Sequence, residues 1–347
     1  MSDWAEAAGR TLMVGVPGTD LDQPTARRLR DLAPGGLILF HRNLDSPVQT
    51  AGLIRDLLEL LPGPSLVALD QEGGRVSRLE PWIGETPTAE VLGRLGETAV
   101  SRFAAATADA LRGLGFNVDF APVTDLCSAD ASNGIADRSF GTDPRVVSRL
   151  AGSFLDALQE QGVAGCLKHF PGLGCTSVDS HHELPVVRRT GAQLEAEELR
   201  PYRDLGSRAA AVMVGHGHYA EWDVPGQPAS GSKRIVQGLL RDRLGYRGLV
   251  VSDDLEMGAV AELDADGEFA VRAVAAGCDL ILYCSDLERA ERARSALERA
   301  AATDPIFGQR LRSAADSVSR TASQWPAPAP DLELWERARH ELSGFAG

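Results

Sequence analysis

The sequence predicts one (β/α)8 barrel, and three observations support that fold. Eight short apolar segments alternate with helical segments along most of the 347 residues. These segments are continuously apolar, which is typical of a parallel sheet covered on both faces. Charged residues follow several of them, as they do at the carboxyl-terminal rim of a barrel. A doubly wound open sheet is the alternative, but such a sheet usually has a GxGxxG turn after its first strand, and the Gly15–Gly18 region does not match that pattern.

Strands and helices follow one another in chain order. A serine or aspartate followed by proline opens the helices expected at 46–61 and 143–162, and Ser232 caps one that ends near Gly245. Further helices are expected at 268–277 and from Ser285 onward. The strands are expected at Leu12–Val16, Gly36–Phe40, Ser65–Asp70, Val118–Val123, Gly165–His169, Ala211–His216, Leu249–Asp253 and Asp279–Cys284.

The last part of the chain lies outside this alternation. Residues 325–330 read WPAPAP, a stiff and extended linker by its proline content. The segment 331–345 that follows contains enough apolar residues for a small helix. We therefore expect a catalytic barrel over residues 1–324 and, over residues 325–347, a linker with a short helix packed on it.

Charge and composition argue against several classes of partner and site. The net charge is -14, from 49 acidic and 35 basic residues, which argues against nucleic acid or an anionic membrane as the main partner. The five cysteines are scattered without a CxxC pair, so neither a zinc site nor a disulfide framework is indicated, and no cofactor or metal is expected. The N-terminus lacks a signal sequence and no apolar run is long enough to span a membrane, so a cytoplasmic protein is expected. The sequence gives no indication of oligomeric state.

The stretch from Ala164 to Pro185, AGCLKHFPGLGCTSVDSHHELP, is the strongest candidate for a functional site. A short apolar strand ends in Lys168 and His169, and a loop punctuated by proline and glycine follows. That loop presents Asp179, Ser180, His181 and His182 in succession. Catalytic groups concentrate on loops held by a rigid scaffold, so a site here is favoured over a merely polar surface loop.

Other predicted strands also end in charged groups that should meet at one rim. Asp70 ends the third strand, and Glu72 and Arg78 follow it. Asp125 and Arg138 come after the fourth, His216 and His218 after the sixth, and Asp253 with Asp254 after the seventh. Glu72 is expected to support its loop through hydrogen bonds.

Carboxylates and polar donors without a metal motif suit sugar chemistry. Glycoside hydrolysis needs a nucleophile or base on one side of the glycosidic bond and a proton donor on the other. Asp70, Arg78, Lys168 and His169 are placed to bind sugar hydroxyls. A histidine is a chemically sound proton donor, because its unperturbed pKa is ~6.5 and a neighbouring carboxylate such as Asp179 favours the protonated form.

Several motifs together resemble glycoside hydrolase family 3, in particular its bacterial single-domain β-N-acetylglucosaminidases. They occur in the family's order and the resemblance covers residues 12–297. The motifs are GGLILFHRN at Gly35–Asn43, DQEGGRVSR at Asp70–Arg78, DRSFGTDP at Asp137–Pro144, KHFPGLGCTSVDSH at Lys168–His181 and SDDLEM at Ser252–Met257.

This resemblance implies a residue for each step of retaining hydrolysis through a covalent glycosyl-enzyme. The nucleophile falls on Asp253, which spacing alone does not distinguish from Asp254. The acid/base residue falls on His181, assisted by Asp179. The sugar-binding positions implied by the family are Asp70, Arg78, Arg138, Lys168 and His169. The implied substrate is a carbohydrate with terminal β-linked N-acetylglucosamine, notably peptidoglycan-derived muropeptides, in cell-wall recycling.

One residue departs from the family motif. The family pattern reads KHFPGHG, whereas Leu173 replaces the second histidine here, which predicts altered loop packing or aglycone preference.

Several alternative functions stay open. A β-N-acetylglucosaminide phosphorylase or a β-glucosidase of the same family has the same motifs. A metallohydrolase is disfavoured because HxH occurs only at His216 and His218, after the sixth strand. A non-catalytic sugar-binding protein has no need of Asp253, Asp179 and His181 together.

Overall fold

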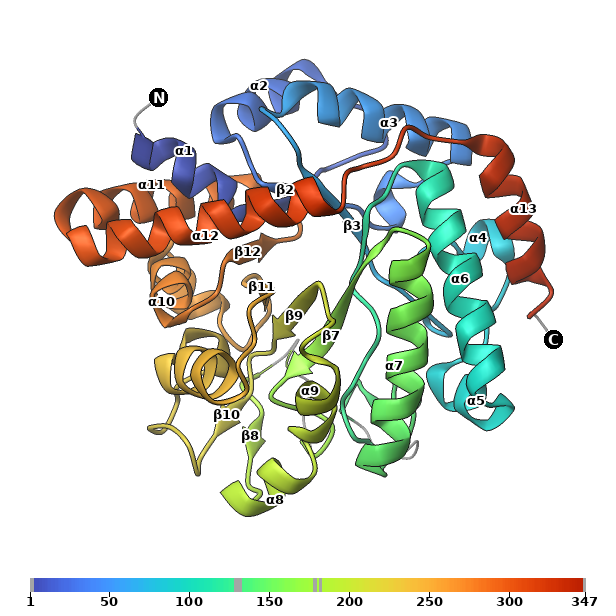
Figure 1. Ribbon diagram of the computed structural model, residues 1–347. Coiled ribbons are helices and arrows are strands. Elements are labelled where there is room, and N and C mark those ends of the chain that lie inside the picture. Colours follow the sequence, from blue (N-terminus) through green and yellow to red (C-terminus); the bar gives the residue numbers. More distant parts are fainter. Residues whose placement is uncertain (1–2, 128–132, 177–179, 181–182, 346–347) are drawn as a thin grey trace.

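Eight parallel strands close into a barrel with helices around it, so the predicted fold is confirmed (Figure 1). The computed structural model describes residues 3–127, 133–176, 180 and 183–345. Around the barrel the strands follow the order β1-β12-β11-β9-β7-β6-β3-β2. Their bounds are β1 Leu12–Gly15, β2 Gly36–Ile38, β3 Leu66–Leu69, β6 Val118–Asp119, β7 Ala164–Phe170, β9 Ala211–Val214, β11 Leu249–Asp254 and β12 Leu280–Tyr283.

Two apolar layers explain why the strands are apolar along their length. Alternate side chains of a strand point to opposite faces of a sheet. In β11, Leu249 and Val251 join the cluster inside the barrel, whereas Val250 joins the cluster between strands and helices. The barrel interior is therefore a packed core below the functional rim.

The predicted strand at 118–123 is shorter than expected. Regular pairing covers only Val118–Asp119, and Val123 forms an isolated bridge with Lys168. Pro122 interrupts the segment, and proline has no N–H to give to a ladder. Residues 121–124 keep separate backbone hydrogen bonds to β7, so the segment stays beside β7 without regular pairing as it runs toward the rim.

The helices begin where the capping residues predict. The Ser46 hydroxyl accepts a hydrogen bond from the Gln49 N–H at 3.2 Å, and the Asp143 carboxylate accepts one from the Arg145 N–H at 2.8 Å. The bounds of the helices are α1 Asp3–Arg10, α2 Gln23–Leu32, α3 Pro47–Leu60, α4 Glu80–Ile83, α5 Ala89–Leu95, α6 Glu97–Leu114, α7 Pro144–Glu160, α8 Gly191–Ala196, α9 Arg200–Leu205, η4 Arg234–Arg243, α10 Glu268–Ala276, α11 Leu287–Thr303, α12 Pro305–Gln324 and α13 Leu332–Ser343, with short 3₁₀ turns η1 His41–Asn43, η2 Ala136–Arg138, η3 Ala229–Gly231 and η5 Ala261–Asp264.

Two small sheets lie outside the barrel. Strands β4 (Gln71–Gly73) and β5 (Val76–Ser77) form an antiparallel hairpin directly after β3. Strands β8 (Val186–Val187) and β10 (His218–Tyr219) pair in the connections that follow β7 and β9. Both sheets therefore brace long loops at the carboxyl-terminal ends of the barrel strands, where active sites form in this fold.

The C-terminal segment returns along the barrel. Val318 and Ala322 of α12 join the interior cluster, so α12 covers one end of the barrel. Residues 326–331 then run without helix or strand to α13, which lies beside α6 (Figure 1). Trp335 of α13 is buried and meets Trp82 edge to face, with ring centroids 5.5 Å apart. None of the helices among the described residues has both the length and the apolarity needed to cross a bilayer.

Candidate active site

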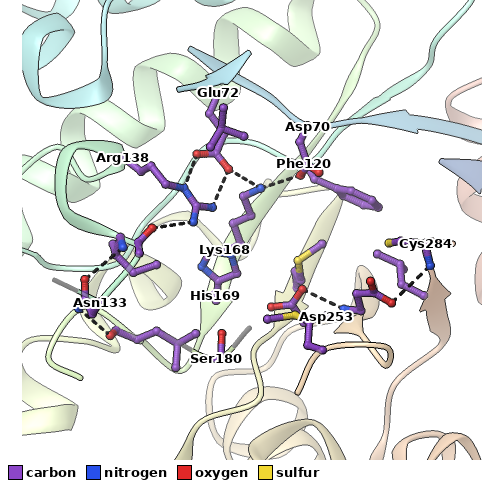
Figure 2. A pocket seen from close by; sticks show the side chains of 18 of the residues that line it. Asp70, Glu72, Phe120, Asn133, Arg138, Lys168, His169, Ser180, Asp253 and Cys284 are labelled. Carbon is purple, nitrogen blue, oxygen red and sulfur yellow. Dashed lines mark hydrogen bonds and ion pairs between the residues drawn. The ribbon is translucent and has the colours of Figure 1, made fainter. Parts of the chain in front are cut away.

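A cavity of about 330 Å³ opens among the loops that follow the barrel strands. Figure 2 shows charged side chains from several strands pointing into it. Such convergence of titratable groups in one concave site is the usual mark of an active site. The lining includes Phe40, Asp70, Glu72, Arg75, Arg78, Asn133, Arg138, Lys168, His169, Leu173, Ser180, Asp253, Asp254 and Cys284.

Four of these side chains form one charged network on the cavity wall. The Lys168 ammonium lies 2.9 Å from Asp70 Oδ1 and 2.6 Å from Glu72 Oε1 (Figure 2). Arg138 binds Glu72 with two parallel hydrogen bonds of 2.8 Å each. Paired bonds of this kind fix the guanidinium in a plane. Glu72 therefore holds Lys168 and Arg138 in fixed positions beside Asp70. The sequence led us to expect that it supports its own loop, and in the structure it also binds these two residues.

Burial and neighbouring charges shift the pKa values of Lys168 and Glu72 in opposite directions. Burial lowers the pKa of Lys168, but Asp70 and Glu72 together raise it above its ordinary value. Burial likewise raises the pKa of Glu72, yet Arg138 and Lys168 hold it well below the usual range. Both groups are thus charged at neutral pH, as buried ion pairs with full hydrogen bonding are.

Arg78 lies on the other side of Asp70. Its guanidinium is 3.6 Å from Asp70 Oδ2 and lies over the Phe40 ring, 5.6 Å from the centroid. Arg42 lies 4.8 Å from the same ring centroid. The aromatic face attracts both cations and orients Arg78 toward the cavity without neutralising it.

His169 is fixed by a buried carboxylate that follows β6. Its Nδ1 lies 2.7 Å from Asp125 Oδ2, and the same carboxylate accepts the Leu173 N–H at 2.6 Å. When the ring is neutral, Nδ1–H donates to Asp125 and Nε2 is left as an acceptor. Asp125 thereby orients the imidazole and the root of the loop after β7 at once.

The two aspartates at the end of β11 are placed differently. Both line the cavity, and Asp253 Oδ1 accepts the Asp254 N–H at 2.9 Å. Asp254 Oδ1 accepts two backbone N–H groups, from Glu256 at 3.0 Å and from Cys284 at 3.3 Å. Burial, Glu256 and Asp253 raise the pKa of Asp254 to about 7. Asp254 is thus engaged with the backbone and is partly neutral near physiological pH.

Leu173 stands at the root of the loop after β7. Its side chain is buried in a small cluster with Val123, Cys127 and Ile135. It also fills the space above two glycines, because a Cβ added at Gly215 would come within 2.9 Å of it and one at Gly217 within 2.8 Å. The leucine therefore packs closely at the root of this loop, and its effect on loop packing relative to the family histidine stays a prediction.

The predicted loop residues are described only in part. Asp179, His181 and His182 lie outside the described residues. Ser180 is buried, lines the cavity, and its carbonyl oxygen accepts the Ala259 N–H at 3.3 Å.

The remaining predicted site residues come together. Asp70, Arg78, Arg138, Lys168, His169 and Asp253 all line one cavity.

His216 and His218 are placed away from the described cavity lining. Both are buried, and neither lines the cavity. The ring nitrogens of His216 lie 2.7 Å from Ser230 Oγ and 2.9 Å from the Asp254 carbonyl oxygen, so it supports the end of β11. Within the described part of the chain, no group of three or more His, Cys, Asp or Glu side chains is arranged to hold a metal ion.

The contacts of two supporting residues escaped the sequence reasoning. Asp125 is visible as a carboxylate after a strand, but its pairing with His169 depends on the early end of β6. Asn133 lies in a connection with no periodicity, and no sequence signal indicates its contacts across to the next loop.

Comparison with known proteins places this geometry in context. The profile of the glycosyl hydrolase family 3 N-terminal domain matches residues 8–320. A β-hexosaminidase of Bordetella avium is 38% identical over 339 residues, which cover 95% of this chain and 93% of that protein. A family 3 β-N-acetylglucosaminidase of Paenibacillus has a similar structure, with a TM-score of 0.87, 32% identity and coverage of 99% of this chain and 69% of that one. Native NagZ of Neisseria gonorrhoeae is also similar, with a TM-score of 0.82, 29% identity and coverage of 97% and 98%.

Proposed function

This chain belongs to glycosyl hydrolase family 3, and from that premise we propose that it is a retaining β-N-acetylglucosaminidase. The observation that carries the proposal is the placement of the Asp253 carboxylate in the same cavity as the Asp70–Lys168–Glu72–Arg138 network. A cavity of about 330 Å³ is at the small end of ligand pockets, which suits one terminal sugar residue. The names of its relatives support N-acetylglucosamine as that sugar.

The charged network and its neighbours bind the sugar in this proposal. Lys168, Arg138 and Arg78 donate hydrogen bonds to hydroxyl or acetamido oxygens, and Asp70 accepts them from hydroxyl groups. His169, oriented by Asp125, completes the set. Because these groups already bind one another, they need little rearrangement when substrate arrives, which keeps the entropic cost of binding low.

Asp253 is the nucleophile in the proposed reaction, and the surroundings of Asp254 support that choice. A nucleophilic carboxylate has to be ionised to attack the anomeric carbon. Asp254 is tied to two backbone N–H groups and its pKa of about 7 leaves it partly protonated. Asp253 therefore has the better-suited carboxylate of the pair.

Hydrolysis proceeds in two steps. In the first, a carboxylate oxygen of Asp253 forms a bond to the anomeric carbon while the glycosidic C–O bond breaks and His181 gives its proton to the leaving oxygen. In the second, His181 takes a proton from water, whose oxygen attacks the same carbon and releases Asp253. Asp179 favours the protonated imidazole before the first step. The same residue serves as acid and then as base, as microscopic reversibility requires.

The natural substrate belongs to the proposal as well. We infer that it is a muropeptide with terminal N-acetylglucosamine, and that the protein acts in the cytoplasm in cell-wall recycling. Accumulation of N-acetylglucosaminyl-anhydromuramyl peptides in the soluble cell fraction of a deletion strain is the expected result. Unchanged muropeptide levels in that strain would contradict this physiological role.

One assay tests the activity. We expect turnover of 4-nitrophenyl β-N-acetylglucosaminide to exceed that of the matching β-glucoside at least 100-fold, with a rate that does not depend on added phosphate. Phosphate-dependent formation of a sugar 1-phosphate indicates the phosphorylase instead, and equal rates on both sugars indicate a broad β-glucosidase. Failure to hydrolyse either glycoside contradicts the proposed activity.

A further inference from the structure

The buried Asn133 side chain joins two loops at the rim of the barrel. It lies in the connection between β6 and α7 and is only 4% exposed. Its Nδ2 donates to the carbonyl oxygens of Gly174 at 2.8 Å and Thr176 at 3.1 Å, and its Oδ1 accepts the Ile135 N–H at 3.1 Å. The amide oxygen also accepts a hydrogen bond from Cys127 Sγ at 3.5 Å, so both ends of the amide have partners. One side chain holds together two segments that are 40 residues apart in sequence.

The segment that Asn133 holds leads directly to the proposed acid/base residue. Its start is fixed separately, since the Tyr219 hydroxyl donates to the Gly172 carbonyl at 2.7 Å and Asp125 accepts the Leu173 N–H. Beyond that root, the Asn133 side chain binds carbonyl oxygens at both 174 and 176. It therefore fixes the backbone of residues 174–176 against the loop that follows β6.

We propose that Asn133 is a positioning residue for proton transfer, which acts by holding the backbone of residues 174–176. This inference rests on the proposed function, in which His181 protonates the leaving oxygen. Asn133 takes no part in the bond-making steps. A misplacement of about 1 Å in a catalytic group can lower a rate by ~10²-fold, so loss of two hydrogen bonds five to seven residues upstream has a measurable effect on catalysis.

Leaving groups of different basicity separate positioning from general damage. A nitrophenolate departs without a proton, so its release depends little on an acid catalyst, whereas a sugar alkoxide depends on it strongly. Displacement of the acid/base residue therefore slows cleavage of a disaccharide much more than cleavage of a nitrophenyl glycoside. A change that merely reduces the amount of folded enzyme lowers both rates by the same factor.

Asn117 offers a matched control. It is also buried and likewise joins separate segments through backbone groups, with Nδ2 donating to Ser65 O at 3.1 Å and Trp325 O at 2.7 Å and Oδ1 accepting the Val67 N–H at 2.6 Å. It precedes β6, at the opposite end of the strand from Asn133. Its loss leaves comparable backbone groups unpaired without touching the loop after β7.

The test compares Asn133→Ala, Asn117→Ala and His181→Ala with the wild-type enzyme. The kcat/KM values are measured on N,N′-diacetylchitobiose and on 4-nitrophenyl β-N-acetylglucosaminide, and hydrogen exchange is followed in peptides covering residues 171–176. For Asn133→Ala we expect a loss at least 10-fold larger on the disaccharide, as for His181→Ala, and faster exchange at 171–176. For Asn117→Ala we expect equal factors on the two substrates and unchanged exchange in that segment.

Two results for Asn133→Ala would overturn the inference. Both differ from the wild-type result that would contradict the proposed function. Equal losses on both substrates for Asn133→Ala, with a selective loss for His181→Ala, assign Asn133 a structural role only. Unchanged exchange at 171–176 in Asn133→Ala shows that the amide does not hold the segment, even if the enzyme is inactive on both substrates. Inactivity of the wild type on both substrates, in contrast, contradicts the proposed function.

Discussion

At the level of single residues, the two aspartates at the end of β11 show how local environment divides roles. The sequence SDD presents two chemically identical side chains. Asp254 accepts the backbone N–H groups of Glu256 and Cys284, whereas Asp253 accepts the N–H of Asp254 and lines the same cavity as the charged network. Environment, and not residue type, is what separates a supporting carboxylate from a reacting one.

We predict that Asp253→Asn and Asp254→Asn differ sharply in activity. An amide cannot form the glycosyl ester, so Asp253→Asn is expected to lower kcat by at least ~10³-fold. Asn at position 254 keeps the Oδ1 acceptor for both N–H groups, so Asp254→Asn is expected to stay within about 10-fold of the wild type. Steady-state rates on 4-nitrophenyl β-N-acetylglucosaminide measure both, and a reversed order of the two losses would falsify the assignment of the nucleophile.

The pKa of Asp254 also predicts a pH dependence of stability. Its pKa is about 7 in the folded protein and ~3.9 in an unfolded chain, so the folded state binds the proton more tightly. The free energy of unfolding therefore falls as the pH rises from about 4 to about 7, by at most about 4 kcal/mol from this group.

Asp254→Asn removes this titration. Urea unfolding at pH 5 and at pH 8 is expected to show that the variant loses about 2 kcal/mol less than the wild type between the two values. Parallel pH profiles for the two proteins would show that Asp254 has an ordinary pKa.

The sequence predicted several residues that the structure brings to one cavity, but not how they pair with one another. Asp70, Arg78, Arg138, Lys168 and His169 were predicted, and they share one cavity. Their binding partners depend on contacts between distant loops, such as Glu72 with Arg138. No pattern within a single segment contains that information, since loop geometry is set by tertiary packing.

At the level of elements, the loop after β7 owes its path to close backbone contact with the loop after β6. Gly174 lies directly against the backbone of Leu126, and a Cβ at position 174 would overlap the Leu126 carbonyl oxygen. Glycine is required there because the two backbones touch, whatever their dihedral angles.

We predict that Gly174→Ala moves the loop root. Relief of the overlap requires a backbone shift, so we expect a stability loss of about 1–3 kcal/mol and a fall in kcat of at least ~10-fold. Chemical denaturation and steady-state kinetics measure the two effects. The control is Gly52→Ala on α3, where the nearest atom to the added Cβ is Arg55 Nη2 at 3.9 Å, and we expect it to leave kcat unchanged. Equal kcat values for Gly174→Ala and the wild type would contradict this account of the loop.

Element prediction from sequence succeeded where capping and apolar runs were clear. Ser46 and Asp143 begin helices as expected, and each predicted barrel strand overlaps an observed one. The strand at 118–123 was predicted too long, because an apolar run does not reveal where Pro122 ends the pairing.

At the scale of the whole molecule, the apolar residues that stabilise the fold lie apart from the polar residues that line the cavity. The interior cluster fills the barrel, the outer cluster fills the space between strands and helices, and the cavity lies at the carboxyl-terminal rim. The C-terminal segment packs against α6, and none of the described residues that line the cavity belongs to α13. We propose that the boundary at 324/325 separates the catalytic barrel from a stabilising appendage.

If this boundary is correct, a substitution in α13 lowers the stability of the protein without lowering its catalytic rate. Trp335 is 1% exposed and packs on Trp82, so Trp335→Ala is expected to lower the free energy of unfolding by about 3–5 kcal/mol. The kcat of the folded variant is expected to stay within about twofold of the wild type. Active-site titration beside urea unfolding measures both quantities, and a large loss of kcat per folded molecule would show that α13 contributes to the site.

The central claim is that catalysis passes through a glycosyl ester on Asp253. Mass spectrometry after incubation with 5-fluoro-N-acetylglucosaminyl fluoride tests it most directly, because the fluorine slows both steps through the oxocarbenium-like transition states while the reactive leaving group lets the ester accumulate. The account predicts a mass increase of one sugar residue, located by peptide mapping on Asp253. An adduct on Asp254 or another residue, or steady turnover of this reagent without any adduct, would contradict it.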